Sequence, residues 1–156
     1  MPNTPSLLQL GATGLFANDA CSDEQKQLAD QILSAVGCSV WLDDEGQIDA
    51  VTAVSGSGPA YFFLMMEAMQ AAAEAQGLST DVAKQLTLQT ALGAATMASQ
   101  SEDSPATLRK KVTSPGGTTE QAIATFNNGG FQTLVTDAML ACADHSRVLA
   151  KQLGDS

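Results

Sequence analysis

Residues 56–73 read GSGPAYFFLMMEAMQAAA, and this stretch decides the fold that we expect. Pro59 suits the first turn of a helix. The helix that follows is apolar around its whole circumference, with Glu67 as the charged residue inside it. The run is shorter than the ~20 apolar residues that a membrane span needs. A helix that is apolar all round is buried among other helices, and because this chain has few of them, we expect a partner subunit to cover it.

Helical patterns continue on both sides of this stretch. A capping residue, Ser79 or Thr80, precedes one helix, and Ser104 with Pro105 opens a short one. An NNGG turn at 127–130 separates the last two helices. The expected helices cover residues 48–54, 59–76, 80–100, 105–111, 119–126 and 131–153.

Residues 1–46 have a different pattern. Two prolines exclude a regular helix from residues 1–5, and residues 7–16 are expected to be extended. Ser22 and Gln25 form a capping box, which opens a helix with Gly37 as the residue that ends it. Residues 38–42 then predict a strand. This strand–helix–strand order is typical of an α/β domain, but the segment is too short to be one.

The composition excludes several classes of protein. With 17 acidic against 7 basic residues the net charge is −10, which argues against binding to nucleic acid or to anionic membranes. A hydrophobic content of 44% excludes a disordered chain. Three widely spaced cysteines and the single His145 predict neither a disulfide framework nor a metal site. We expect reduced thiols in a cytoplasmic protein without a signal peptide.

Residues 113–119 (TSPGGTT) are the best local candidate for a binding site. They place two glycines and several hydroxyl groups directly before a helix, where free N–H groups and the positive end of the helix dipole favour an anion. Arg109, Lys110 and Lys111 lie just upstream and would favour a carboxylate or a phosphate. The alternative is a plain connection between helices with a hydroxyl cap.

Two further segments carry weaker signals. Residues 56–58 (GSG) begin like a dinucleotide fingerprint, but Tyr61 stands where the third glycine belongs and no strand precedes them, so a kink between packed helices is the default interpretation. Thr52 places a hydroxyl group one turn before this kink. Glu102 and Asp103 form an acidic pair close to the basic cluster, and the sequence alone favours a solvated loop for them.

Taken in order, these segments resemble the pyrroline-5-carboxylate reductases of proline biosynthesis over essentially the whole chain. Residues 49–61 (DAVTAVSGSGPAY) are similar to the family's core motif, and residues 113–119 to its second signature. Residues 128–131 (NGGF) match a third point, and residues 1–5 and 11–14 resemble the end of its nucleotide-binding domain. The family's Rossmann domain with its glycine-rich fingerprint is not contained in this chain.

The resemblance implies a mainly α fold. An interlocking all-helical dimerisation and substrate-binding domain at 47–156 would follow a remnant of the Rossmann-like domain at 1–46. It also implies reduction of 1-pyrroline-5-carboxylate to L-proline by NADPH or NADH, with the active site built across two subunits. We expect a homodimer that can assemble further into a decamer. The chain alone is expected neither to bind the cofactor nor to turn over.

The resemblance also implies roles for single residues. The substrate carboxylate would be held by the hydroxyls of the loop and by the amides of its two glycines, namely Ser114, Gly116, Gly117, Thr118 and Thr119. Thr52 would donate a proton or position a water at the ring nitrogen, which Glu102 would approach. Asn3 and Val112 would border the nicotinamide. Two other hypotheses stay open: a stand-alone, non-catalytic dimerisation module, and a small-anion sensor that uses residues 113–119.

Overall fold

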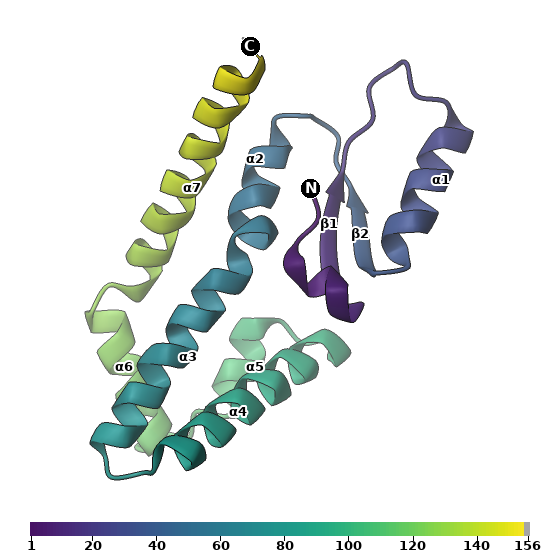
Figure 1. Cartoon of the computed structure of the whole chain (residues 1–156). Helices are drawn as coiled ribbons and strands as arrows, with labels where there is room; N and C mark the ends of the chain where they lie inside the picture. The colour runs from purple at the N-terminus through teal and green to yellow at the C-terminus, as the bar shows by residue number, and fades with distance from the viewer. Residues whose placement is uncertain (155–156) are drawn as a thin grey trace. The chain divides into compact units, whose positions relative to one another are not determined.

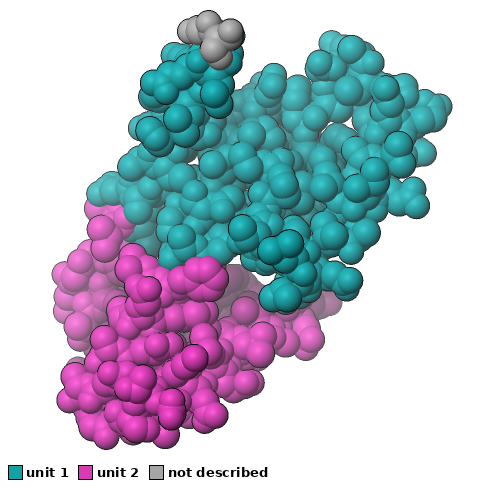
Figure 2. All heavy atoms as spheres, viewed as in Figure 1, with its two compact units in different colours: residues 1–61, 135–156 teal, residues 62–134 magenta. Residues whose placement is uncertain are grey.

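The computed structural model describes residues 1–154, and helices dominate it (Figure 1). The chain forms two compact units (Figure 2). Unit 1 joins Met1–Tyr61 with the C-terminal part from Val135 onward, and unit 2 is Phe62–Leu134. Two long helices, α3 (Gly58–Ala75) and α7 (Phe131–Gly154), run through both units. Each unit is described by itself.

Unit 1 contains a two-stranded parallel sheet. Strand β1 (Gly11–Leu15) pairs with β2 (Gly37–Trp41), and helix α1 (Asp23–Ser34) connects them. The capping box that opens α1 is confirmed, since Ser22 Oγ accepts the Gln25 amide at 3.3 Å and the Gln25 side chain accepts the Ser22 amide at 2.9 Å. Parallel neighbours need such a crossover helix, so the predicted strand–helix–strand order is correct.

Two local expectations in this region are wrong. Gly37 does not end the helix, because α1 finishes at Ser34 and Gly37 is already the first residue of β2, paired with Gly11. The extended stretch begins at Gly11 and not at residue 7, because Thr4–Leu8 form a 3-10 helix, η1. Pro5 is tolerated there because the first turn of a helix has no acceptor for its missing N–H.

The 56–59 break is part of a nearly continuous helical segment. Helix α2 (Gln47–Val51) passes into a π-helical turn, η2 (Thr52–Gly56), and α3 follows at Gly58. The Ser57 amide donates to the Thr52 carbonyl at 2.8 Å, the five-residue spacing of a π turn. Beside this segment lies the part of α7 that belongs to unit 1, held by an Arg147 Nε–Asp49 Oδ2 ion pair at 3.6 Å.

Two helices of unit 2 begin with a hydroxyl cap. Besides its shares of α3 and α7, it contains α4 (Thr80–Gln100), α5 (Pro105–Lys111) and α6 (Thr118–Asn128). Ser79 Oγ accepts an amide at the start of α4, and Ser104 Oγ does so at α5, so both predicted caps are confirmed. The Phe126 and Phe131 rings meet edge to face with centroids 5.6 Å apart.

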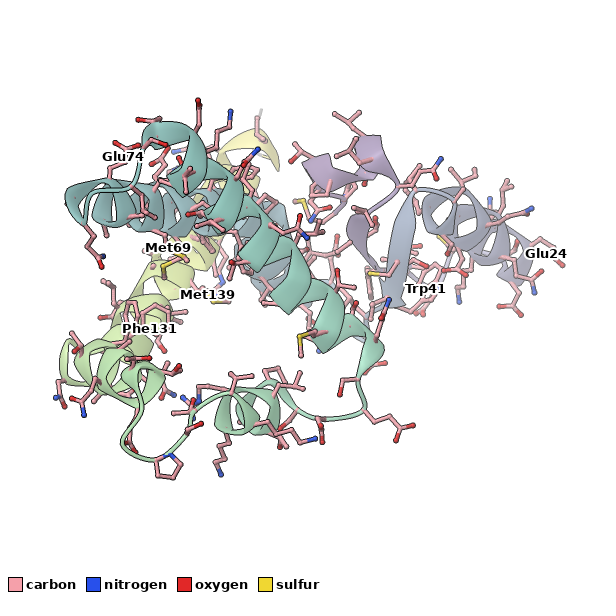
Figure 3. The ribbon with its side chains drawn as sticks, turned by 90° about the horizontal axis from the view of Figure 1, so that it is seen from below. Glu24, Trp41, Met69, Glu74, Phe131 and Met139 are labelled. Carbon is pink, nitrogen blue, oxygen red and sulfur yellow. The ribbon has the colours of Figure 1, made fainter. Side chains whose placement is uncertain are left out.

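The described chain buries little of its apolar surface. Its buried apolar residues are small: Ala53, Ala83 and Ala143. By contrast Phe62 and Leu64 on α3 are 68% and 66% exposed. Figure 3 shows side chains standing out from the ribbon around the helices, among them Met69 of α3 and Trp41 of β2, which are also exposed. A surface this apolar is typical of one that another chain covers.

Within residues 1–154, none of the helices combines the length and the hydropathy that crossing a bilayer requires.

Candidate anion site and the second candidate turn

The loop between α5 and α6 has a backbone that depends on its two glycines. Gly116 has φ of 72°, in the left-handed region that glycine adopts without strain. A Cβ on Gly117 would lie 3.0 Å from the Ser114 carbonyl oxygen. Gly117 is extended and precedes α6 without any side-chain cap. The backbone at the start of α6 is therefore not covered by a capping side chain.

The amides of this loop divide into two groups. The Gly117 amide donates to the Ser114 carbonyl at 3.0 Å, and the Gly116 amide donates to Glu120 Oε2 at 2.8 Å. Both glycine amides thus have an acceptor within the loop in this structure. The amides of Thr118 and Thr119 have no acceptor among the described residues, as is usual in the first turn of a helix.

The same loop and helix start carry three hydroxyl groups. The side chains of Ser114, Thr118 and Thr119 are exposed, so their hydroxyls are accessible to a ligand. A carboxylate accepts hydrogen bonds from both hydroxyl and amide donors. The loop therefore has the donors of a small anion site, and the amides of Thr118 and Thr119 are free to contribute to it.

An open pocket of about 260 Å³ lies beside the loop. It is lined by Arg109, Lys110, Thr113, Glu120 and Ile123. Arg109 and Lys110 form no ion pair in the described part of the chain, so both charges remain available to an anion. Glu120 brings a negative charge to the same wall. The Thr113 hydroxyl donates to the Arg109 carbonyl at 2.6 Å and fixes the end of α5.

Glu120 is the residue that the sequence analysis missed. Its carboxylate accepts the Gly116 amide, the donor that a bound carboxylate was expected to use. The signal is present in the sequence, because a Glu three residues after the helix cap has the spacing of a capping box. Here the cap is Gly117, and the side chain of Glu120 reaches one residue further back.

Thr52 lies in the π-helical turn of unit 1. Its Oγ1 donates to the Ile48 carbonyl at 2.9 Å, and the residue is half-buried. Ser55 makes the same type of bond, from its Oγ to the Val51 carbonyl at 3.0 Å. Such bonds to the preceding turn bend helices slightly, and they keep both hydroxyls close to the backbone.

Asn3 also belongs to unit 1 and has both ends of its side chain engaged. Its Nδ2 donates to the Ser55 carbonyl at 3.0 Å, and its Oδ1 accepts the Ala12 amide at 2.9 Å. The Asn3 side chain therefore bonds to the backbone of two other segments. Val112, the other residue expected beside a nicotinamide, lies at the end of α5 in unit 2 and is 60% exposed.

A half-buried cluster of polar side chains lies at the 56–59 turn and at the start of α3. The Ser57 hydroxyl and the Cys142 thiol lie 3.2 Å apart. The Tyr61 hydroxyl is buried and has no hydrogen-bond partner among the described residues. Burial and, after it, the nearby Cys142 thiol raise the pKa of Tyr61 above its ordinary value of 10.0, while Ser57 acts in the opposite direction.

The candidate residues fall into the two units. Unit 1 holds Thr52 and Asn3, and unit 2 holds Glu102, Val112 and the whole 113–119 loop. Glu102 is exposed in the turn between α4 and α5, next to Asp103, which pairs with Lys111. The structure thus brings the residues of the loop together within unit 2, whereas Thr52 belongs to unit 1.

The fold and the candidate site together define a class of protein. The chain is a helical oligomerisation domain with a small sheet at its N-terminal end and a candidate anion site at a helix start. The family described as pyrroline-5-carboxylate reductase dimerisation matches residues 45–149, and the chain belongs to this family.

Relatives support the assignment over nearly the whole chain. A pyrroline-5-carboxylate reductase of Pseudomonas aeruginosa is 62% identical over 154 residues, which are 99% of this chain and 56% of the relative. One from Pasteurella multocida is 46% identical, over 97% of this chain and 55% of the relative. The chain therefore spans about half the length of the curated relatives that it matches.

Solved structures agree with the fold. A pyrroline-5-carboxylate reductase from Coxiella burnetii matches with a TM-score of 0.92 and 52% identity, over 96% of this chain and 55% of the other. A pyrroline carboxylate reductase from Plasmodium falciparum, solved with NADP bound, matches with a TM-score of 0.85 and 31% identity, over 95% and 60%. The predicted fold class, mainly helical with a small strand–helix–strand segment, is confirmed.

Proposed function

We propose that this chain is the dimerising and substrate-binding part of a pyrroline-5-carboxylate reductase, which reduces 1-pyrroline-5-carboxylate to L-proline with NADPH or NADH. The observation that supports this most is the 62% identity to the Pseudomonas aeruginosa reductase over almost the whole chain. We place the remnant of the nucleotide-binding domain at residues 1–46 and the helical domain at 47–156.

In this proposal the 113–119 loop holds the substrate carboxylate. The hydroxyls of Ser114, Thr118 and Thr119 and the free amides at the start of α6 donate to it, supported by the positive end of the helix dipole. Gly116 and Gly117 give the loop its shape. The Gly116 amide joins these donors when Glu120 releases it.

Thr52 and Glu102 act at the ring nitrogen. A cationic imine accepts hydride more readily than a neutral one, so a hydroxyl that supplies a proton and a carboxylate that stabilises the charge both assist. Thr52 Oγ1, which donates to the Ile48 carbonyl in this structure, turns toward the substrate for this step. The nicotinamide cofactor supplies the hydride when bound.

The apolar surface of α3 is proposed to form the homodimer interface, with a decamer as a further level of assembly. This agrees with the exposure of Phe62, Phe63 and Leu64, and dimerisation is also the description of the matching family. We propose a cytoplasmic location, which agrees with the free cysteines Cys21, Cys38 and Cys142. We propose no metal for the reaction.

Three measurements on two proteins test the proposal. The first protein is this chain, and the second is a fusion in which the N-terminal part of the Pseudomonas aeruginosa relative precedes Met1. Analytical ultracentrifugation should find a dimer for both. A proline titration followed by amide NMR of the chain should shift residues 114–119 saturably. The fusion should consume NADPH with 1-pyrroline-5-carboxylate, whereas the chain alone should not.

The outcomes separate the hypotheses. A dimeric chain whose fusion is inactive and which does not bind proline would favour the non-catalytic dimerisation module. A chain that binds phosphate or acetate as well as proline at residues 114–119, with an inactive fusion, would favour an anion sensor. Steady NADPH consumption by the chain alone would contradict the proposed division of labour.

A further inference from the structure

The π-helical turn leaves one backbone carbonyl without its usual helical partner. In an α-helix the Ser55 carbonyl would accept the N–H of residue 59. That residue is Pro59, which has no N–H. The amide of the next residue, Ala60, donates to the Ser57 carbonyl at 3.0 Å instead. A carbonyl that is partly withdrawn from water and has no donor destabilises the fold.

Asn3 provides the missing donor from 52 residues away. Its Nδ2 donates to the Ser55 carbonyl at 3.0 Å. The other end of the same side chain, Oδ1, accepts the Ala12 amide of β1 at 2.9 Å. One planar amide group therefore ties the first strand to the turn that carries Thr52.

The surrounding backbone holds Asn3 in place for this task. Met1 and Gly14 exchange two backbone hydrogen bonds, of 2.8 Å and 3.1 Å. This pairing holds the first residues of the chain beside β1. The Asn3 side chain then lies next to the strand, where it accepts the Ala12 amide. Asn3 itself is extended and directly precedes η1. Its position is thus fixed from both sides.

We infer that Asn3 is a positioning residue of the reductase: by satisfying the Ser55 carbonyl it sets the π-helical turn, and through it the Thr52 hydroxyl, relative to the sheet. The inference rests on the proposed role of Thr52 and does not depend on whether Asn3 also borders the cofactor. Thr52 is the first residue of this turn, and its carbonyl accepts the Ser57 amide at 2.8 Å. A displaced Ser55 carbonyl therefore displaces Thr52 as well.

The substitution that isolates this function is Asn3→Asp. Aspartate keeps an oxygen for the Ala12 amide, but it places a second oxygen against the Ser55 carbonyl, where two acceptors repel. The experiment is a double-mutant cycle in the fusion, with Asn3→Asp and Thr52→Val alone and together. The readouts are kcat and KM for 1-pyrroline-5-carboxylate, with thermal unfolding as the control for folding.

The expected result is coupling between the two sites. Asn3→Asp should lower kcat about tenfold when Thr52 is present and less than about twofold in the Thr52→Val background, with KM nearly unchanged. Asn18→Asp is the matched control, because Asn18 Oδ1 also accepts a backbone amide, from Ala20 at 3.1 Å, but in an exposed turn. It should leave kcat unchanged in both backgrounds.

Each other outcome is decisive. Equal losses of kcat in both backgrounds, or no loss from Asn3→Asp alone, would overturn the positioning role while leaving the role of Thr52 intact. A Thr52→Val variant with full kcat would instead refute the proposed role of Thr52, and the positioning role with it. If Asn3→Asp yields no folded protein, Asn3→Ala, which removes both bonds without adding a charge, takes its place in the same cycle.

Discussion

Two glycine-rich turns of this chain look alike in sequence and differ in structure. The 56–59 turn (GSGP) and the 113–119 loop (TSPGGTT) both combine glycine, proline and hydroxyl residues before a helix. In the first, a side chain from another segment satisfies the Ser55 carbonyl, and the hydroxyls of Thr52 and Ser55 bond to the backbone. In the second, the hydroxyls are exposed and the first helical amides are free.

The difference teaches that composition alone does not distinguish a positioning turn from a binding loop. What matters is where the donors and acceptors of the turn find their partners. The 56–59 turn uses its own chain, which makes it suited to hold one group in a fixed place. The 113–119 loop leaves donors for a ligand. Substitutions in the first should therefore change kcat, and those in the second should change binding.

The largest effect is expected from Thr52→Val. Loss of a group that delivers or positions a proton should lower kcat of the fusion by about 100-fold, while KM stays within about twofold. Steady-state kinetics with 1-pyrroline-5-carboxylate measure both. Thr125→Val is the matched control, because the Thr125 hydroxyl makes the same bond to its preceding turn, to Gln121 at 3.0 Å. A rise in KM at constant kcat would contradict the comparison.

The next effect is expected from Thr119→Val, which removes one hydroxyl of the 113–119 loop without changing the side-chain shape. The dissociation constant of proline for the chain should rise by about tenfold, corresponding to one charge-assisted hydrogen bond, and KM of the fusion should rise with it. Calorimetry or NMR titration measures the first. Thr96→Val on α4, whose hydroxyl bonds to Leu92, should change neither. If kcat fell and proline binding held, the loop would not be the binding element.

Much of this contrast could be predicted from local sequence. The caps at Ser22, Ser79 and Ser104 are where their spacing predicts them, because a cap is a bond between residues three apart. The loop before α6 was likewise recognisable from its glycines and hydroxyls. The misplaced Gly37 shows the limit, since pairing with Gly11, 26 residues earlier, decides that residue's place in β2.

The interactions that were not predicted join distant residues. No periodicity relates Asn3 to Ser55, although Pro59, which has no N–H, already indicates that the Ser55 carbonyl needs a donor from elsewhere. The bond between Glu120 and Gly116 is local, but it could not be predicted with certainty of type. A Glu at this position either caps the helix or remains a solvated charge, and both cases have the same sequence pattern. Local patterns likewise carry no information on the distance between Thr52, in unit 1, and the 113–119 loop, in unit 2.

A smaller effect is expected from Glu120→Gln, which tests whether the Glu120 carboxylate competes with the ligand of the 113–119 loop. Glutamine still offers an oxygen to the Gly116 amide but removes a negative charge from the wall of the pocket. Proline should bind about threefold more tightly at low salt, with the gain shrinking as salt screens the charge. Titrations at two ionic strengths measure this, with Glu74→Gln on α3 as the control. Weaker binding would mean that the Glu120 carboxylate supports the site instead of competing with the ligand.

The smallest effect concerns the one unsatisfied group beside the 56–59 turn, the buried Tyr61 hydroxyl. Tyr61→Phe should leave the free energy of unfolding within about 1 kcal/mol of the parent and shift it toward greater stability, because no hydrogen bond is lost. The raised pKa of Tyr61 also predicts a pH dependence. Its contribution to stability is present below pH 10 and is lost as the pH rises through the folded pKa, because the unfolded chain releases the proton first.

Two measurements check this dependence. Tyr61 is the only tyrosine, so its ultraviolet absorbance reports the ionisation directly. Chemical denaturation at several pH values should show a free energy of unfolding that falls with pH in the parent and does not do so in Tyr61→Phe. A large destabilisation by Tyr61→Phe would instead reveal a hydrogen bond at this position and extend the internal bonding of the 56–59 turn to its last polar group.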